Sequence, residues 1–312
     1  MSGKSDFIGA SLSEGQETEA GSPGTGTSPE LEPVSSRELQ KAGLILLDRF
    51  LDICGRHGLR YYLNAGTLLG AVRHQGFIPW DDDIDVCMPR PDYERFLKYA
   101  EQELPDGLRA VWFGCQGREE HPQYTCQIQD TRFPIVQMIA RETRDTCAWI
   151  DVFPMDGMPA NPVRRKIHAL HLLYLRARIQ ASMFDRNVNI HKKGRPFHER
   201  LAMWVITRLK WGASGDTYEL MEKLDTALKK YPADQSGFWI NFMGAYKTKE
   251  TIPVTAYGQG AKLPFEGREC SVPASPEIVL TRLYGDYMTP VKPDDSEDGH
   301  RLYRRKTDKV VS

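Results

Sequence analysis

The residues best suited to chemistry are four aspartates in one short run, WDDDIDV at positions 80–86. Strands usually avoid Asp, which packs poorly and competes for backbone hydrogen bonds, so this run needs a compensating partner. Residues two apart in an extended chain point the same way, which puts Asp81, Asp83 and Asp85 on one face. Neighbouring carboxylates repel, whereas Mg²⁺ accepts oxygens from carboxylates and substrate phosphates. The run therefore indicates a site for Mg²⁺ (or Mn²⁺) and phosphoryl chemistry; a solvated acidic turn is the alternative.

The segment before this run predicts a place for the phosphates. Residues 60–64 are typical of a strand, and Ala65-Gly66-Thr67 of a tight turn into a short helix over 68–73, with Thr67 as its N-cap. Gly66 would let a phosphate approach the backbone, where free N–H groups of the first helical turn favour an anion. Gly70 would allow close helix–strand packing, with a simple spacer as the alternative. Arg73 would bind phosphate, with a solvated surface side chain as the alternative.

A further carboxylate lies in the predicted strand CAWIDVF at positions 147–153. An isolated Asp151 among apolar neighbours is costly unless it is paired, so a third metal ligand and a general base both remain open roles. Asp156 is a second candidate, but Met155-Asp156-Gly157 is also typical of a turn. We therefore assign the third carboxylate to Asp151.

The stretch GTLLGAVRHQGFIPWDDDID at positions 66–85 resembles the signature of the LicD family. Further similarity runs from about residue 38 to 300, through IDVFPMDG at 150–157, FEG at 265–267 and YGDYM at 284–288. The resemblance implies a nucleotidyltransferase fold, in which a Gly-Ser or Gly-Thr turn precedes an Asp-x-Asp strand and a later strand supplies a third carboxylate. Asp151 matches that third position. Fukutin-type phosphoribitol transferases are more distant relatives.

The resemblance implies a metal-dependent transferase of a phospho-alcohol group. The implied donor is CDP-choline, with a CDP-polyol as the variant, and the implied acceptor is a hydroxyl of a cell-surface glycan or glycoconjugate such as teichoic acid or lipopolysaccharide. Asp83, Asp85 and Asp151 would be catalytic, and Gly66 and Thr67 would position the donor phosphates. Two other classes stay open: a nucleotidyltransferase acting on a small molecule or RNA, and a non-catalytic glycan-binding scaffold.

Choline is a quaternary ammonium, a cation that proteins usually hold against aromatic faces. The sequence offers Trp80 beside the aspartates as the first candidate face. The others are Tyr62, Trp149, Trp204 and Trp211. Core packing is the alternative role for each of these aromatic side chains.

The 312 residues carry 41 basic and 42 acidic side chains, a formal net charge of −1 that predicts no general attraction to nucleic acid. Six scattered cysteines without a C-x-x-C pair are typical of a reduced, cytoplasmic chain with buried thiols. Residues 1–35 are poor in large apolar groups and predict a disordered tail without signal-peptide character. No stretch has the roughly 18 apolar residues of a membrane span, so only peripheral membrane association is compatible with the sequence.

The pattern of apolar residues predicts an α+β fold, with a mixed sheet core, flanking helices and a helical subdomain. We expect helices over 36 to about 55 and 91–104, and short strands over 108–113, 124–129 and 135–140. The main domain would cover 36–290, with a helical insertion over about 162–231 containing helices at 163–184, 196–211 and 217–231. A strand over 238–246, a hairpin over 262–273 and a helix over 276–284 would complete the core, and 291–312 would be a charged end that includes His300.

The helical insertion is rich in basic residues, which predict either solvated faces or a cleft that attracts anionic substrates. They are Arg164, Arg165, Lys166, Arg176, Arg178, Arg186, Lys192, Lys193 and Arg195. His168 and His171 lie three apart on one predicted helix, but without a third ligand they are weak evidence for zinc.

Overall fold

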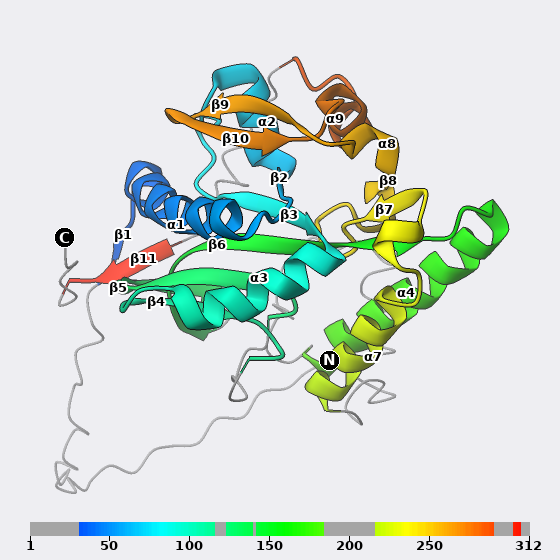
Figure 1. Ribbon diagram of the computed structural model, residues 1–312. Helices are drawn as coiled ribbons and strands as arrows, with labels where there is room; N and C mark the ends of the chain where they lie inside the picture. The colour runs from blue at the N-terminus through cyan, green and yellow to red at the C-terminus, as the bar shows by residue number, and fades with distance from the viewer. Residues whose placement is uncertain (1–30, 116–122, 140–141, 184–215, 290–301, 307–312) are drawn as a thin grey trace, which may run out of the picture.

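The computed structural model of the chain describes residues 31–115, 123–139, 142–183, 216–289 and 302–306, in which helices and a mixed sheet form an α+β fold (Figure 1). In chain order the elements are β1 Leu31–Pro33, α1 Ser36–His57, β2 Tyr62–Leu63, α2 Ala65–His74, β3 Asp85–Pro89, α3 Arg90–Glu103, β4 Leu108–Val111, β5 Cys126–Ile139, β6 Glu142–Met158, α4 Pro162–Ser182, α7 Thr217–Leu228, η1 Ala233–Gln235, β7 Phe238–Ile240, η2 Lys247–Glu250, β8 Thr251–Pro253, α8 Val254–Tyr257, β9 Ala261–Phe265, β10 Arg268–Val272, α9 Pro276–Tyr284 and β11 Leu302–Arg305. The predicted fold class is confirmed.

The main sheet has the order β1-β11-β5-β6-β3-β2, with β4 also pairing with β5, and β7 joining the far end of β6 to β8. The long hairpin β5–β6 is its backbone, and β3 runs parallel to β6. Helices α1 and α3 lie along the sheet. Their apolar side chains, such as Phe50 of α1, share one buried core with Val86 of β3 and Ile150 of β6. The sheet therefore holds the start of β3 and the middle of β6 side by side.

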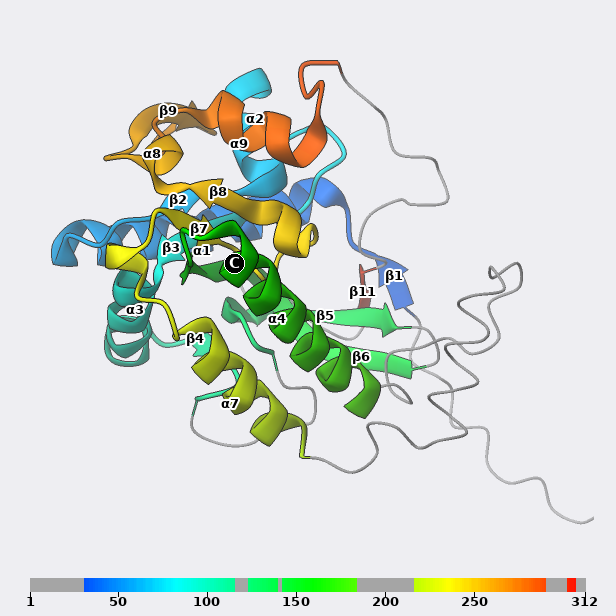
Figure 2. The same ribbon diagram turned by 90° about the vertical axis from the view of Figure 1, so that its right-hand side faces the viewer.

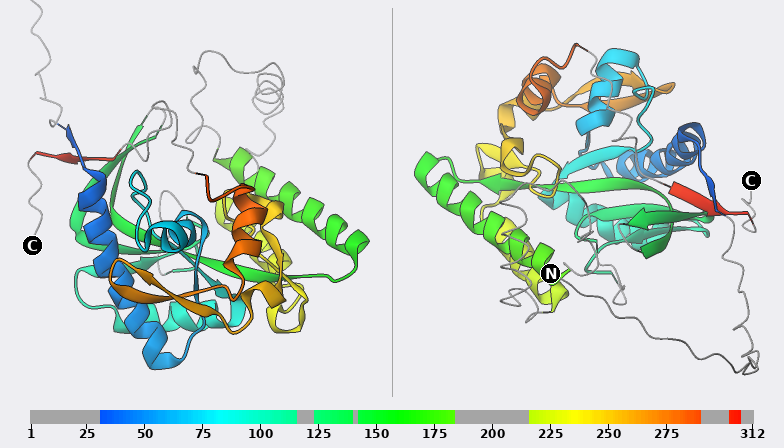
Figure 3. Two further views of the ribbon diagram at one scale, coloured as in Figure 1. Left: turned by 90° about the horizontal axis from the view of Figure 1, so that it is seen from above. Right: turned by 180° about the vertical axis from the view of Figure 1, so that it is seen from behind.

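Two smaller groups of elements flank this sheet. The hairpin β9–β10, α2 and α9 lie above the sheet in Figure 1 and overlie it in the view from above (Figure 3, left). On the other side α4 and α7 pack together around Leu172, Leu175 and Leu224, and they meet β7 through Ile240 (Figure 2).

Local signals explain several element ends. α1 begins after Ser35, whose hydroxyl accepts a hydrogen bond from Glu38 N while the Glu38 carboxylate accepts one from Ser35 N, and it ends at Gly58 with φ +60°. α9 covers 276–284 as predicted and ends at Gly285 with φ +73°. The hairpin predicted around Glu266-Gly267 is present as β9–β10.

Other boundaries differ from the predictions. The strands expected at 124–129 and 135–140 form one strand, β5, with a register irregularity between Asp130 and Pro134. The strand expected over 238–246 ends at Ile240. Leu31–Pro33, assigned to the tail, form β1, and residues 302–305, assigned to the charged end, form β11. These two strands form because β1 pairs with β11 and β11 pairs with β5, and such long-range pairings cannot be predicted from local composition. Residues 1–30 and the helix expected over 196–211 lie outside the described residues.

Candidate active site

Asp85 and Asp151 lie directly opposite each other on parallel strands. Asp85 opens β3, and its register partner on β6 is Asp151. The backbone bond from Asp151 N to Ile84 O, 2.9 Å long, fixes this alignment. Both aspartate side chains are half-buried, whereas Ile84 and Val86 are buried in the core. The predicted alternation of Asp85 with its apolar neighbours is therefore present.

Negative charge accumulates around Asp85. Burial raises the pKa of the Asp85 carboxyl well above its ordinary value, and the carboxylates of Asp83, Asp151 and Asp81 raise it further. Such mutual destabilisation is what a bound cation relieves, because an opposite charge favours the ionised form. One electrostatic cluster, called the acidic cluster below, thus contains all four predicted carboxylates: Asp81, Asp83, Asp85 and Asp151.

Asp151 is held by hydrogen bonds from its own strand and from β5. The indole Nε1 of Trp149 donates to Oδ2 at 2.8 Å, and Nε2 of Gln127 donates to Oδ1 at 3.1 Å. Gln129 donates to Gln127 at 3.1 Å, and Arg109 donates to Gln129 at 3.0 Å. This chain of donors orients the Asp151 carboxylate.

The start of α2 differs from the prediction. Thr67 is not the N-cap: the helix begins at Ala65 after Asn64, and Thr67 lies in its first turn. The buried Thr67 Oγ1 accepts a hydrogen bond from Asp85 N at 2.9 Å, which ties α2 to β3. A Cβ atom on Gly66 would lie 2.5 Å from Oδ2 of Asp81. The anion next to Gly66 is therefore the Asp81 carboxylate itself, at a helix N-terminus that favours negative charge.

Gly70, Arg73 and Trp80 have individual surroundings. A Cβ atom on Gly70 would lie 2.3 Å from the Gly76 carbonyl oxygen, so the close contact is with the loop after α2 and not with a strand. Arg73 Nη1 donates to Tyr287 O at 3.0 Å, while its buried Nε has no partner within the described residues. Trp80 is half-buried against the core. Phosphate binding by these residues stays a prediction.

Asp156 has a different role from Asp151. Its two carboxylate oxygens accept hydrogen bonds from Nε and Nη2 of Arg90, each 2.7 Å long, and the side chain is 1% exposed. Arg90 also donates to Asp225 on α7 at 3.1 Å and to the Tyr124 hydroxyl at 3.2 Å. Asp156 is thus bound in a buried ion pair, which agrees with the choice of Asp151 as the third carboxylate.

Comparisons with known proteins agree with this geometry. Residues 58–165 match the family described as LicD/FKTN/FKRP, nucleotidyltransferase domain. The chain is 28% identical to the lipopolysaccharide cholinephosphotransferase LicD of Haemophilus influenzae over 87% of this chain and 98% of that protein. A match to the human ribitol 5-phosphate transferase FKRP is 59% identical but covers 9% of this chain and 6% of that protein.

Residues 58–165 therefore resemble a LicD-type nucleotidyltransferase domain. The resemblance found in the sequence is confirmed, and so is the prediction of a LicD-like phosphotransferase. The matched residues contain the whole acidic cluster, from Asp81 to Asp151. None of the described helices combines the length and the apolar character needed to span a bilayer.

The acidic cluster fits a cation that binds together with phosphates. Within the part of the chain that the structure describes, no three His, Cys, Asp or Glu side chains form a ready-made metal cage. Mg²⁺ does not require one, because it is usually held by one or two carboxylates plus waters and substrate phosphates. The pairing of Asp85 with Asp151, together with the neighbouring carboxylates that raise the pKa of Asp85, makes this place chemically suited to a cation.

Several residues near the site were missed or misjudged from the sequence. The role of Trp149 as a donor to Asp151 follows from their spacing of two on one strand, and the same parity argument could have found it. Gln127 needed the β5–β6 register. Tyr62 is buried and donates to Gly258 O, so its face is not open to choline. Trp204, Trp211 and His300 lie outside the described residues.

The remaining metal and cysteine expectations concern ordinary structural residues. His168 is buried against the Tyr231 ring, and burial lowers its pKa to about 4. All six cysteines are free, and Cys54, Cys87, Cys126 and Cys270 are buried, as predicted.

Proposed function

We propose that this protein transfers a phospho-alcohol group, phosphocholine from CDP-choline, to a hydroxyl of a cell-surface glycan or glycoconjugate. The observation that carries the proposal is the in-register pair Asp85–Asp151 within a cluster of mutually destabilised carboxylates. Such a cluster is suited to a cation that neutralises a nucleotide's phosphates. The donor group and the glycan acceptor are supported by the name of the Haemophilus influenzae relative, a lipopolysaccharide cholinephosphotransferase.

The metal, Mg²⁺ or Mn²⁺, would be held by Asp83 and Asp85, with Asp81 and Asp151 as the neighbouring carboxylates. When bound, it supplies positive charge to the phosphates of the donor. Asp81 lies against Gly66 at the start of α2, and Thr67 fixes the backbone of Asp85, so this part of the chain would set the position of the carboxylates toward the donor.

For Asp151 we propose a ligand or positioning role in preference to a general base. Both of its oxygens already accept hydrogen bonds, from Trp149 and Gln127. A general base must take a proton from the acceptor hydroxyl on a carboxylate oxygen, and both oxygens of Asp151 are already used as hydrogen-bond acceptors.

The test is a donor panel. The full chain is incubated with Mg²⁺ and CDP-choline, CDP-glycerol, CDP-ribitol or a nucleoside triphosphate, and the release of CMP or pyrophosphate is measured with and without glycan acceptors. CMP from CDP-choline supports the proposal. Pyrophosphate from a triphosphate would overturn it in favour of nucleotidyl transfer, because attack would then fall on the α-phosphorus. Mg²⁺-dependent binding of CDP-choline by calorimetry separates a missing acceptor from an inactive protein.

A second donor is favoured by one observation, the 59% identity to the ribitol 5-phosphate transferase FKRP over 29 residues. In that case CDP-ribitol and not CDP-choline would yield CMP in the same panel. The cytoplasmic location and the teichoic acid or lipopolysaccharide nature of the acceptor remain predictions.

A further inference from the structure

We propose that the cavity between α4, the β7–β8 region and α9 binds an anionic sugar unit, a phosphorylated sugar, of the glycan acceptor. This inference rests on the proposed function, because it names the chemical class of the acceptor. The acidic cluster itself does not indicate whether the acceptor is neutral or charged.

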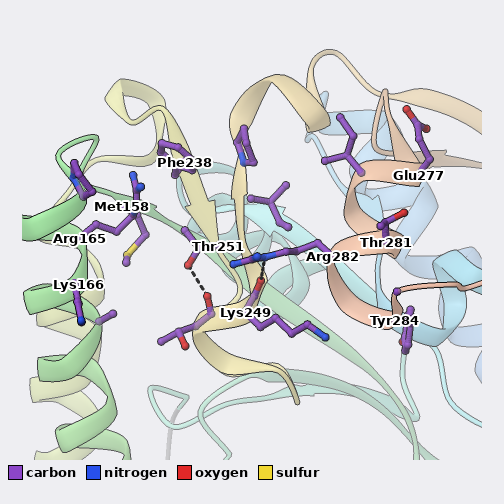
Figure 4. A pocket seen from close by; sticks show the side chains of 17 residues that line it. Met158, Arg165, Lys166, Phe238, Lys249, Thr251, Glu277, Thr281, Arg282 and Tyr284 are labelled. Atoms are coloured by element: carbon purple, nitrogen blue, oxygen red, sulfur yellow. Dashed lines mark hydrogen bonds between the residues drawn. The ribbon is translucent and has the colours of Figure 1, made fainter.

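The cavity has a volume of about 1080 Å³ and is built from three parts of the chain. Arg165 and Lys166 on α4 form one wall, and Thr281 and Arg282 on α9 form the opposite wall (Figure 4). Lys249 lies between them. Binding sites for drug-sized ligands have volumes of roughly 300–1,000 Å³, so this cavity has room for more than a single small ion.

The charge of the lining is strongly positive. Four cations, Arg165, Lys166, Lys249 and Arg282, face one acid, Glu277. Within the described part of the chain, no salt bridge joins any of the four to a carboxylate. A cavity with such a surplus of cations attracts anions and is poorly suited to a neutral or cationic ligand.

Three of the four cations are held in place by backbone oxygens or rings, which fixes them without neutralising them. Arg282 Nε donates to Lys249 O at 3.1 Å, and Lys249 Nζ donates to Leu283 O at 2.6 Å. The Arg165 guanidinium donates to Pro159 O at 3.2 Å and lies 4.1 Å from the centroid of the Phe238 ring. Preset cations lose less freedom on binding an anion than flexible surface side chains do.

Tyr284 lines the cavity, and its ring packs edge-on against Tyr246 with 5.5 Å between the ring centroids. Burial raises the pKa of the Tyr284 hydroxyl, and the charges of Asp85 and Asp81 act on it in the same direction. None of the four cluster aspartates lines the cavity. The proposed function assigns the donor phosphates to the aspartates, so the positive cavity is left for the other substrate.

The first experiment measures binding without metal or nucleotide, so that it does not depend on turnover. Glucose 1-phosphate and methyl glucoside are titrated into the full chain by calorimetry. We expect glucose 1-phosphate to bind at least roughly tenfold more tightly, a difference of about 1.4 kcal/mol. Equal affinities, or no binding of glucose 1-phosphate, would overturn the proposal.

A matched pair of variants on α4 locates the site. Lys166→Glu changes a lining residue, and Arg164→Glu makes the same kind of charge reversal at an exposed neighbour that does not line the cavity. We expect Lys166→Glu to weaken glucose 1-phosphate binding roughly tenfold and Arg164→Glu to leave it within about twofold, since the first replaces a contact of about 1.4 kcal/mol. Equal weakening by both would show a diffuse charge effect and contradict the assignment.

A competition arm separates acceptor from donor. Saturating CDP-choline with Mg²⁺ should leave glucose 1-phosphate binding intact, whereas displacement would mean that the cavity holds the donor. CMP release from CDP-choline to water is measured in the Arg164→Glu control protein and should equal that of the unaltered chain. If no donor yields CMP but cavity-dependent binding persists, the proposed function fails. If CMP is released but binding ignores Lys166, the cavity assignment fails.

Discussion

Asp85 and Asp151 are register partners on adjacent parallel strands, with the Asp151 N–H bonded to the carbonyl oxygen of Ile84. Their proximity is set by strand pairing and not by a loop. Because side chains alternate along a strand, a shift of one residue in this pairing would turn one carboxylate to the other face of the sheet. The site therefore depends on the same backbone hydrogen bonds that hold the sheet together.

The first prediction concerns the acidic cluster. Asp85→Asn and Asp83→Asn should each abolish metal-dependent turnover, a loss of several kcal/mol of transition-state stabilisation, because each removes a proposed metal ligand. The fold should persist, since Asp85 is repelled by its neighbours. CMP release and the melting temperature are measured together. Asp82→Asn is the control, and an equal loss there would contradict the assignment by alternation.

The second prediction tests the hydrogen bond from Trp149 to Asp151. Trp149→Phe keeps an aromatic side chain but removes the N–H, and a hydrogen bond to a charged group contributes about 1.5–3 kcal/mol. We expect kcat to fall on the order of tenfold or more with little change in the KM for the donor. Trp239→Phe is the matched control, because its indole donates to Ala233 O in the core. It should lower stability and leave kcat unchanged.

The third prediction contrasts two helical glycines. Gly70→Ala should destabilise the protein by about 1–3 kcal/mol, because its Cβ would collide with the Gly76 backbone. Gly55→Ala in α1 meets nothing within 4 Å and should stabilise by about 0.5–1 kcal/mol through helix propensity. Urea denaturation of both variants tests the opposite signs. Stabilisation by Gly70→Ala would show that the loop yields easily.

The fourth prediction separates the two β6 aspartates. Asp156→Asn should cost about 3–5 kcal/mol of unfolding free energy, because it removes the carboxylate that accepts two hydrogen bonds from the buried Arg90 and leaves that guanidinium with Asp225 as its one acidic partner among the described residues. Asp151→Asn should change stability by less than about 1 kcal/mol, since the amide keeps one acceptor oxygen for a hydrogen bond. The reverse order of stabilities, measured by urea denaturation, would show that Asp151 and not Asp156 is the structural carboxylate.

The fifth prediction is a pH effect of Glu250. Burial raises its pKa from 4.5 to about 7, although Tyr246 N and Arg176 act in the opposite direction. Between these values the unfolded chain binds fewer protons at this site, so the contribution of Glu250 makes stability fall as pH rises from about 4.5 to 7. Glu250→Gln should remove that slope. The free energy of unfolding of both proteins is measured by denaturation between about pH 5 and about pH 8. An unchanged slope would place the titration elsewhere.

Local signals in the sequence were sufficient for much of the fold. The capped helix after Ser35, the helix ending at Gly285 and the turn at Glu266-Gly267 all follow from short-range residue preferences. The alternation of Asp85 with the buried Ile84 and Val86 was predicted correctly. The expected strand did not extend to Asp81 and Asp83, because β3 begins at Asp85. The start of α2 was wrong because Asn64 and Ala65 carry no strong cap signal, and Ala65 has an unusual φ of +45°.

Long-range features were not available from the sequence. The pairing of β1 with β11 and the register of β5 with β6 join segments far apart in the chain. The contact of Asp81 with Gly66 and the cavity beside Tyr284 exist only once these segments are assembled. The identity of Mg²⁺, the phosphate contacts and the donor remain predictions.

The bonds from Arg90 to both Asp156 and Asp225 tie the first residue of α3, the end of β6 and α7 into one buried unit. The helices after β6 are therefore not an exchangeable module. Grafting this region from a relative onto the sheet would require an acid at the position of Asp225, or the graft would leave Arg90 with one buried partner fewer. Acceptor specificity is thus better altered by single changes along the α4 and α9 walls than by recombination of whole segments.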